Sequence, residues 1–482
     1  MPAILQEVLD PFYHDGRVNK PLVFLFILIN FLVLVNAILH DPYQGYDAGD
    51  HIHYIKALAI NKEIPTCAES AQCYIPPLAY MLPAIVLATG RIDLWHAAKF
   101  AQLINVLLSL GLTYYLLKIC DLVDPKNIIY KLSSLAMLGI LPVFYKTFAL
   151  IRGETYLPLL IVFIAYQVLS IFLARGNLVS NLILLGLAFG LSILARQWGF
   201  LVLPAIFLIA IYAVIRDHSN IGKSVSMLIV CILVPILVAG WYYLIMFQRY
   251  GSLTAWDRPA STLSLGDFPP EFYFGTGSGK LFTDPVRPSF SNQFPAIFYS
   301  DVWGDYSEYF LVYARDTRTG EYIISKYLDI MIRSGKPLPD WVDTNRYTIN
   351  GYLGRVNFIS LLPSAIFAAG FIFTLIQIIR SLIKRPDDGR IVGQTIFFLI
   401  VLSSLAGYGW YLLRYQNQGQ GGDLIKATHM MQIFPFLGLL AGGILERLWK
   451  WQPKYWMAAM IALGLIFIYN LPAMITHYSL IP

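Results

Sequence analysis

Residues 21–39 read PLVFLFILINFLVLVNAIL, an apolar run without a charged side chain. Its length matches the roughly 20 residues that a helix needs to cross the hydrocarbon core of a bilayer. Further apolar stretches follow at 97–119, 128–148, 156–174, 180–195, 199–215, 225–247, 357–379, 394–413, 427–446 and 456–475. We therefore expect an all-α polytopic membrane protein with about 11 transmembrane helices.

The composition favours a membrane protein over a soluble one. Of the 482 residues, 57% are hydrophobic and 13% are charged, whereas soluble domains carry about 25% charged residues. The chain therefore lacks the charge to cover a water-facing surface of its size. Its net charge of +6 is not gathered into a basic patch on a soluble face, so we expect no nucleic-acid partner.

The distribution of Lys and Arg predicts the orientation. With the N-terminus in the cytoplasm, most cations of the short loops fall on the cytoplasmic side. The opposite side then receives two large polar segments. We divide the chain into an N-terminal transmembrane module at 1–247 with its first outer loop at 40–96, a small extracytoplasmic cap at 248–356, and C-terminal transmembrane helices at 357–482.

The first outer loop is expected to contain structure of its own. Residues 47–61 have the pattern of a short amphipathic helix, and 76–90 are apolar but too short to span, which is typical of a helix lying in the membrane interface. Between them, Cys67 and Cys73 bracket a polar stretch. In an oxidising compartment they could form a disulfide; two free thiols are the alternative.

The stretch Tyr46-Asp47-Ala48-Gly49-Asp50-His51-Ile52-His53-Tyr54-Ile55 carries the most chemistry. On a helix that starts near Asp47, the side chains of Asp47, His51 and Tyr54 share a face, and Asp50 and His53 are displaced from it. A carboxylate facing a cavity at the membrane surface can act as a general base toward a hydroxyl. Two alternatives stay open: an acidic residue that only caps the helix, or a metal site that uses Asp50 and His53.

Several cations fall at the predicted outer ends of helices. Charges at membrane depth are costly and usually face a cavity. Converging cations could hold an anionic phosphate, for which Arg offers bidentate geometry; each cation alone could instead reach toward lipid head groups. As a set, we interpret them as a phosphate site: Lys146, Arg152, Arg196, Arg414 and Lys426. Glu154 is expected to pair with Arg152.

The long outer segment contains a cluster of aromatic and acidic residues. Residues 299–306 read YSDVWGDY and include Asp301 and Trp303. Flat aromatic faces and carboxylates suit a sugar-binding surface, since they offer stacking and hydrogen bonds to hydroxyls. Packing inside the cap is an equal alternative.

Together these motifs resemble the GT-C superfamily of polytopic glycosyltransferases, in particular the branch that is similar to protein O-mannosyltransferases and lipid A aminoarabinose transferases. The resemblance spans most of the chain, but each motif is short. It rests on Asp47-x-x-x-His51-x-x-Tyr54-Ile55, Ile75-Pro76-Pro77-Leu78-Ala79-Tyr80, Ala195-Arg196-Gln197-Trp198-Gly199, Gly240-Trp241-Tyr242-Tyr243 with Arg249-Tyr250-Gly251, Asp301-Val302-Trp303-Gly304 and Lys426-Ala427-Thr428-His429. The second motif lacks a leading Gln and one Tyr of the family pattern, and His429 stands where the family has Tyr.

The resemblance implies a reaction. The donor would be a polyprenyl-phosphate-linked sugar, and Asp47 would deprotonate the hydroxyl of a lipid, glycan or protein acceptor, with inversion at the anomeric carbon. Developing charge on the leaving phosphate would be stabilised by preorganised cations. The implied phosphate-binding residues are Arg196, Lys426 and Arg152. The implied substrate-binding residues are His51, Tyr54, Tyr80, Asp301, Trp303 and His429.

The resemblance also implies a location and leaves one cofactor open. The protein would be integral to a membrane, with a bacterial plasma membrane suiting it well, and its active site would be extracytoplasmic. Some members of the superfamily use a divalent metal and others do not. The main alternative function is a transporter or flippase of a lipid-linked sugar, which predicts broken helices and half-chain repeats; we find no repeat in the sequence. A non-catalytic scaffold is the third possibility.

Overall fold

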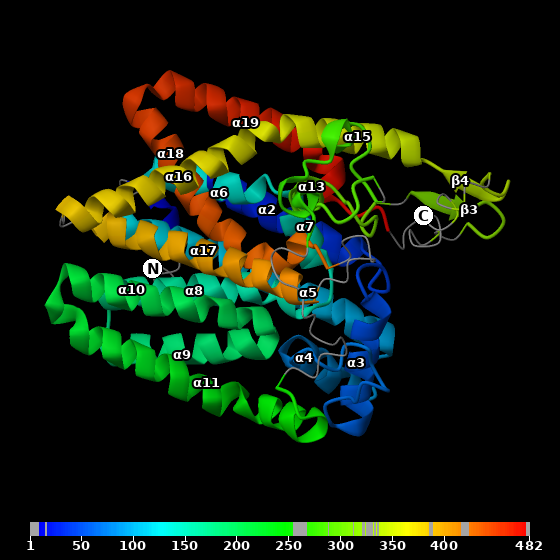
Figure 1. The fold of residues 1–482 in the computed structure, drawn as a ribbon, viewed down its shortest axis with the longest axis horizontal. Coiled ribbons are helices and arrows are strands. Elements are labelled where there is room, and N and C mark those ends of the chain that lie inside the picture. Colours follow the sequence, from blue (N-terminus) through cyan, green and yellow to red (C-terminus); the bar gives the residue numbers. More distant parts are fainter. Residues whose placement is uncertain are drawn as a thin grey trace.

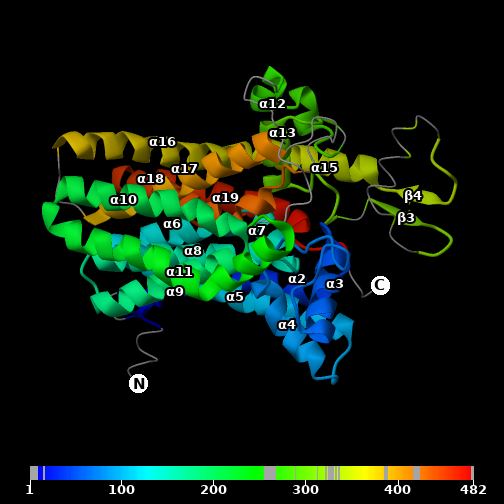
Figure 2. The ribbon, with the colours of Figure 1, turned by 60° about the horizontal axis from the view of Figure 1, so that its bottom comes forward.

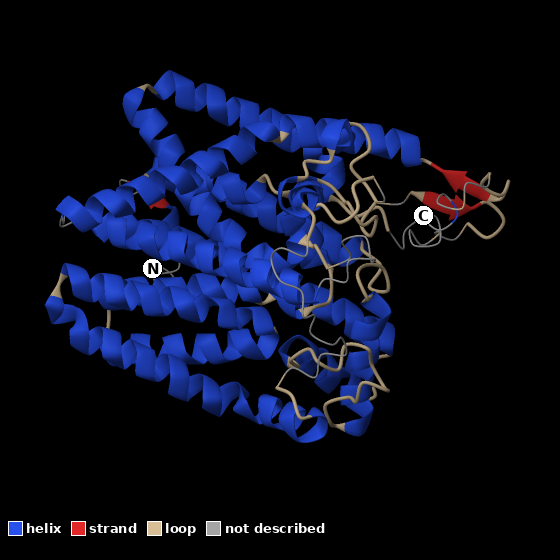
Figure 3. Cartoon of the chain, viewed as in Figure 1, coloured by secondary structure: helices blue, strands red, loops and turns tan. Residues whose placement is uncertain are grey.

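Long helices dominate the computed structural model and run roughly along one direction (Figure 1; Figure 3). The structure describes residues 9–14, 17–253, 268–287, 289–311, 313–320, 323, 331, 334, 337–384, 389–415 and 424–478. Within these residues, strands form only two short two-stranded sheets, β1 (Tyr13–His14) with β2 (Arg17–Val18) and β3 (Ala314–Asp316) with β4 (Val342–Thr344).

The described residues contain ten helices that are long and apolar enough to cross a membrane, or up to eleven if a bent pair is counted as one span. This confirms the predicted all-α polytopic membrane protein. The principal helices are α2 (Lys20–Leu39), α5 (Leu94–Val123), α8 (Leu157–Phe172), α9 (Leu178–Ala195), α10 (Leu203–Arg216), α11 (Ile221–Tyr250), α16 (Leu361–Lys384), α17 (Gly389–Tyr415), α18 (Phe434–Trp451) and α19 (Pro453–Met474).

Short 3₁₀ segments precede several of these helices. Three of them carry residues of the candidate site, namely η2 (Gly153–Thr155) before α8, η3 (Gln197–Val202) before α10 and η7 (Ala427–Ile433) before α18. The others are η1 (Asp10–Phe12), η4 (His218–Asn220) and η6 (Ser278–Phe282).

One predicted span is not a continuous helix. The stretch 128–148 is divided into α6 (Ile128–Gly139) and α7 (Pro142–Ala149), which are bent by 63°. Pro142 disfavours the helical conformation of the residue before it, and Leu141 is extended with φ −86° and ψ 112°. The apolar stretch predicted as one span is therefore a bent pair of helices.

The polar segments gather at one end of the bundle. Both ribbon views place α3, α4, α13, α15 and the β3–β4 hairpin there (Figure 1; Figure 2). We call this the outer end, after its predicted orientation. Its helices are α3 (Ala48–Asn61), α4 (Leu78–Ala88), α12 (Pro270–Phe274), α13 (Phe294–Trp303) and α15 (Arg346–Ile359). The predicted amphipathic helix corresponds to α3, and the predicted interface helix to α4.

Close helix contacts and an apolar exterior characterise the bundle. On α18, a Cβ at Gly442 would lie 2.1 Å from the Ser134 hydroxyl of α6, so only glycine permits this approach. Large apolar side chains of α2 and α11 point outward, including Phe24, Ile27 and Leu237. Such exposure is costly in water and suits contact with lipid tails.

Candidate active site

Asp47 lies at the outer end, directly before α3. Its backbone is in the left-handed region with φ 55°, and its side chain makes no capping hydrogen bond to the helix. The capping alternative therefore does not describe this carboxylate. Asp47 Oδ2 lies 3.7 Å from Lys426 Nζ, and the side chain is 47% exposed. The Lys426 charge lowers the pKa of Asp47 to about 2, against the opposing effect of burial.

Lys426 is held from two sides. Its backbone N–H donates to the Tyr408 hydroxyl of α17 at 2.8 Å, directly before η7. Its ammonium lies 4.6 Å from the ring centroid of Tyr46, and the Arg152 guanidinium lies 5.5 Å from that ring. Tyr46 thus contacts two of the three predicted phosphate-binding cations through its ring.

The next helix turn adds a buried imidazole. His51 Nδ1 lies 2.6 Å from the Tyr80 hydroxyl of α4, and the Tyr54 ring stacks on Tyr80 with centroids 4.4 Å apart. Burial lowers the pKa of His51 to about 3 and raises the pKa of Tyr80, so both are neutral at pH 7. His53, by contrast, is exposed.

Glu154 connects the remaining cations. Its fully buried carboxylate lies 3.2 Å from Arg152 Nε, 3.0 Å from Arg196 Nε and 3.6 Å from His429 Nε2. The sequence predicted only its pairing with Arg152. A carboxylate within two residues of an arginine, at the start of an apolar run, does signal a buried polar site, but it does not reveal the partners on other helices.

A glycine permits this convergence. A Cβ at Gly153 would lie 2.0 Å from the Ala195 carbonyl oxygen, so only glycine lets η2 pass this close to the end of α9. The passage places Glu154 beside Arg196, which caps α9 in an extended conformation. The two arginines, far apart in sequence, thereby share one carboxylate.

Several buried side-chain nitrogen and oxygen atoms in this region have no hydrogen-bond partner among the residues that the structure describes. They are Arg152 Nη1, Arg196 Nη1, His51 Nε2, His429 Nδ1, Trp198 Nε1 and the Tyr242 hydroxyl. Leaving a buried polar group without a partner costs about 1–3 kcal/mol, and most native proteins avoid it. Three cations, Arg152, Arg196 and Lys426, face two carboxylates here. The arrangement can therefore accept a further anion.

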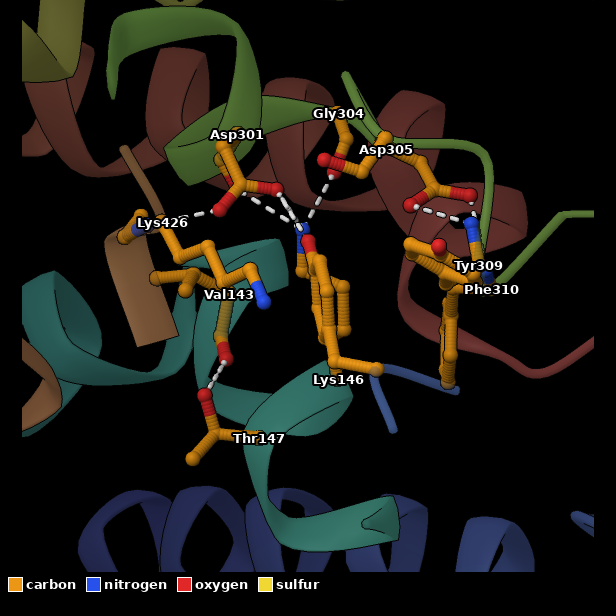
Figure 4. A network of polar contacts seen from close by, with 12 residues as sticks. Val143, Lys146, Thr147, Asp301, Gly304, Asp305, Tyr309, Phe310 and Lys426 are labelled. Atoms are coloured by element: carbon orange, nitrogen blue, oxygen red, sulfur yellow. Dashed lines mark hydrogen bonds and ion pairs between the residues drawn. The ribbon is translucent and has the colours of Figure 1, made fainter. Parts of the chain in front are cut away.

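Asp301 and Trp303 have surroundings that match one of the two predicted alternatives, packing inside the protein. Both are buried. Asp301 pairs with Lys146 (Figure 4), and Trp303 Nε1 donates to Ser364 Oγ at 3.0 Å. The structure thus favours the packing alternative over a sugar-binding surface for both residues, and it assigns Lys146 to Asp301 and not to the phosphate site.

The structure also bears on two alternatives that the sequence left open, a metal site at Asp50 and His53 and free thiols at Cys67 and Cys73. In the part of the chain that the structure describes, no three His, Cys, Asp or Glu side chains gather as metal ligands. Asp50 is partly exposed and His53 exposed, beside the cluster. Cys67 and Cys73 are joined in a disulfide with 4.9 Å between their Cα atoms.

Comparisons with known proteins give a loose structural likeness. No protein-family model and no curated protein sequence matches the chain. Crystal structures of ArnT from Cupriavidus metallidurans, one bound to undecaprenyl phosphate and one in the apo state, are 13% identical to it. The alignments cover 87% of this chain and 76% of ArnT, with TM-scores of 0.37 and 0.39.

Proposed function

We propose that this protein is a membrane glycosyltransferase that moves a sugar from a polyprenyl-phosphate donor to an acceptor hydroxyl at the outer end of the bundle. The observation that carries the proposal is the carboxylate of Asp47 standing 3.7 Å from Lys426, beside a buried cluster of cations with spare donors. A base next to an anion site is what transfer from a lipid phosphate requires.

The cationic cluster is suited to the phosphate of a lipid. Among the described residues, Arg152 and Arg196 each have an Nη1 atom without a hydrogen-bond partner. Guanidinium groups bind phosphate oxygens in pairs. They lie where η2 and η3 open the membrane-crossing helices α8 and α10. A phosphate bound there would let its polyprenyl tail enter the apolar layer. Lys426, next to Asp47, would contact the oxygen that bridges phosphate and sugar.

Asp47 is assigned the role of general base. The acceptor oxygen attacks the anomeric carbon as its proton passes to the Asp47 carboxylate. The bond from the anomeric carbon to the phosphate oxygen breaks, and its electron pair leaves with the polyprenyl phosphate. Attack opposite the leaving group inverts the configuration. Because the leaving oxygen gains negative charge, the cations stabilise the transition state more than the bound donor.

The donor also restores the basicity of Asp47. Without it, Lys426 holds the pKa of Asp47 at about 2, which makes the carboxylate a weak base. A bound phosphate competes for the Lys426 ammonium and so raises the proton affinity of Asp47. Donor binding would thereby prepare the base for the acceptor.

Neutral imidazoles complete the proposed site. We assign the Tyr80 hydroxyl as the donor to His51 Nδ1, which leaves His51 Nε2–H as a donor toward substrate. Tyr54 supports this pair by stacking, and its own hydroxyl donates to the Ile75 carbonyl at 3.0 Å. His429 directs Nε2 toward the Glu154 carboxylate at 3.6 Å, which leaves its Nδ1 as a candidate acceptor toward substrate. The donor set is cationic and suits an anion better than a divalent metal, so the proposed steps use none.

A transporter of a lipid-linked sugar is the second candidate, and one observation favours it. The α6–α7 span is broken, as transporter helices often are. The polar cluster, however, lies at helix ends of the outer face and not at the break between Gly139 and Pro142. The test below separates the two functions.

The decisive experiment uses the full chain in liposomes with radiolabelled undecaprenyl-phosphate mannose, glucose and 4-amino-4-deoxyarabinose, plus extracted bacterial lipid as acceptor. We expect the wild type to transfer label from at least one donor and Asp47→Asn to transfer none above background, with both variants equally folded. Movement of intact donor across the bilayer, equal in wild type and Asp47→Asn and without transfer, would instead establish the transporter.

A further inference from the structure

Asp301 connects three separate segments through one buried carboxylate. Its Oδ1 accepts hydrogen bonds from the Tyr46 hydroxyl at 2.9 Å and from the Lys146 ammonium, and its Oδ2 accepts from the Ala427 N–H at 2.6 Å. Figure 4 shows this carboxylate between α13, α7 and the start of η7. Both Asp301 and Lys146 are buried.

Two of these contacts reach the neighbours of proposed functional residues. Tyr46 precedes Asp47 in the chain, and Ala427 follows Lys426. A hydrogen bond to each neighbour fixes the backbone from which the functional side chain projects. The Asp301 carboxylate therefore fixes the backbone positions of both Asp47 and Lys426, whose side chains lie 3.7 Å apart.

Lys146 fixes the position of Asp301 in turn. Its ammonium also donates to the Asp301 carbonyl at 3.0 Å and to the Gly304 carbonyl at 3.3 Å. The ammonium is therefore surrounded by acceptors at the end of α13. A buried ion pair by itself is weak evidence for stability, because desolvation offsets much of the attraction. Its value here lies in the geometry that it holds.

We propose that Asp301 is a positioning residue for sugar transfer, whose carboxylate holds the segments of Asp47 and Lys426 at their working separation. This inference rests on the proposed function and goes beyond it, since Asp301 contacts neither donor nor acceptor. Small displacements of reacting groups, of about 1 Å, can lower a rate about a hundred-fold.

Asp305 provides a matched control on the same turn of chain. It is equally buried, and its carboxylate accepts from the N–H groups of Tyr309, Phe310 and Leu311 at 3.2, 2.7 and 2.8 Å. Asp305 thus bonds only to the backbone of its own loop, whose Tyr309 ring lies 4.7 Å from the Tyr46 ring. Asp301 instead bonds directly to Tyr46 and to Ala427 of two other segments. Replacing either aspartate with asparagine removes one buried charge and puts an amide N–H₂ where donors already point.

The test compares wild type, Asp301→Asn and Asp305→Asn in the liposome transfer assay, together with hydrogen–deuterium exchange. We expect Asp301→Asn to lower kcat about a hundred-fold, with a smaller change in donor KM, and to speed exchange in peptides covering 44–48 and 424–430. Asp305→Asn should speed exchange near 309–311 and keep kcat within a few-fold of wild type.

A second variant protects the test against simple misfolding. Lys146→Gln combined with Asp301→Asn removes both charges of the pair, so it leaves no uncompensated buried lysine. If it unfolds at the wild-type temperature and kcat stays low, the effect is positional. Equal kcat and equal exchange in Asp301→Asn and Asp305→Asn would overturn the positioning role. Transfer by the wild type is measured first. If the wild type transfers no sugar, the proposed function is overturned, whatever the variants do.

Discussion

The two ends of the helix bundle both contain arginines that pair with carboxylates, but they differ in the balance of the two charges and in how deeply the groups are buried. At the end opposite the outer one, Glu446 of α18 accepts from Arg390 and from Asn127 Nδ2 at 2.9 Å, and pairs with Lys450. Asp124 accepts from Arg390 at 2.8 Å and from Asn127 at 2.7 Å. We call these five residues the inner network.

The outer cluster of Arg152, Arg196, Lys426, Asp47 and Glu154 has the opposite balance. Both arginines share Glu154, and in the described part of the chain each has an Nη1 atom without a hydrogen-bond partner. In the inner network, two carboxylates meet two cations and an amide. Charges in balance can hold helices together, whereas an excess of buried cations can be offset by an anionic ligand. We therefore interpret the inner network as structural and the outer cluster as the proposed anion site.

The largest effect should come from the base itself. Asp47→Asn keeps the size of the side chain and removes its ability to take a proton, so transfer should fall by about 10²–10⁴-fold. Asp50→Asn, one helix turn away and partly exposed, is the matched control and should retain transfer within a few-fold. The measurement is donor turnover in liposomes. Equal loss in both variants would remove Asp47 from its assigned role.

Loss of one outer arginine should have the next largest effect. Arg196→Gln removes one donor to the developing phosphate charge and should lower kcat by about 10²–10³-fold. Arg249→Gln is the control, because Arg249 is also at the outer end but donates to the Ile64 carbonyl at 2.6 Å and approaches Glu63. Single-turnover rates with saturating donor compare the two. Similar rates in both would mean that Arg196 is a structural cation.

A third prediction compares the carboxylates of the two ends. Glu154→Gln and Glu446→Gln both leave a buried arginine with a weaker partner, so each should cost about 3–5 kcal/mol of stability. Only Glu154→Gln also removes negative charge from an anion site. It should bind undecaprenyl phosphate about ten-fold more tightly, a difference of about 1.4 kcal/mol.

Thermal unfolding with and without undecaprenyl phosphate measures this difference, because a ligand stabilises the state that binds it. The lipid should restore more of the lost unfolding temperature in Glu154→Gln than in Glu446→Gln. If the lipid restores the unfolding temperature equally in the two variants, the distinction between an anion-binding outer cluster and a structural inner network is contradicted.

Sequence reasoning reached the fold more fully than the site. Apolar runs report membrane spans directly, because backbone groups in lipid must be paired within the helix. The run 128–148 indicates a span through its hydrophobicity, but hydrophobicity does not report the 63° bend at Pro142.

The site depends on pairs that no local pattern reveals. Glu154 meets Arg196 and His429 across more than 40 residues of chain in one case and more than 270 in the other. For Asp301 a local pattern was present, but it suited two interpretations. Its aromatic neighbours indicated a sugar surface as readily as packing, and only its buried ion pair with Lys146 separates the two.

The smallest predicted effect is a shift in pH dependence that tests the link between Lys426 and Asp47. The folded pKa of Asp47 is lowered to about 2, below the ordinary value of about 3.9. The stability gained from this pairing is therefore present above pH 4 and is lost as the pH falls through about 2. The acid limb of kcat/KM, which reports the free enzyme, should lie below the range of an ordinary carboxylate.

Lys426→Met should move that limb upward, toward the ordinary carboxyl value, because it removes the charge that contributes most to the lowered pKa. Wild-type kcat/KM should be flat between pH 4 and 7, whereas the variant, with its lower overall rate, should decline as the pH approaches 4. Lys62→Met is the control, since Lys62 lies at the far end of α3. A limb that stays in place in Lys426→Met would show that Lys426 does not set the charge state of Asp47, and the outer cluster would then bind its anion independently of the base.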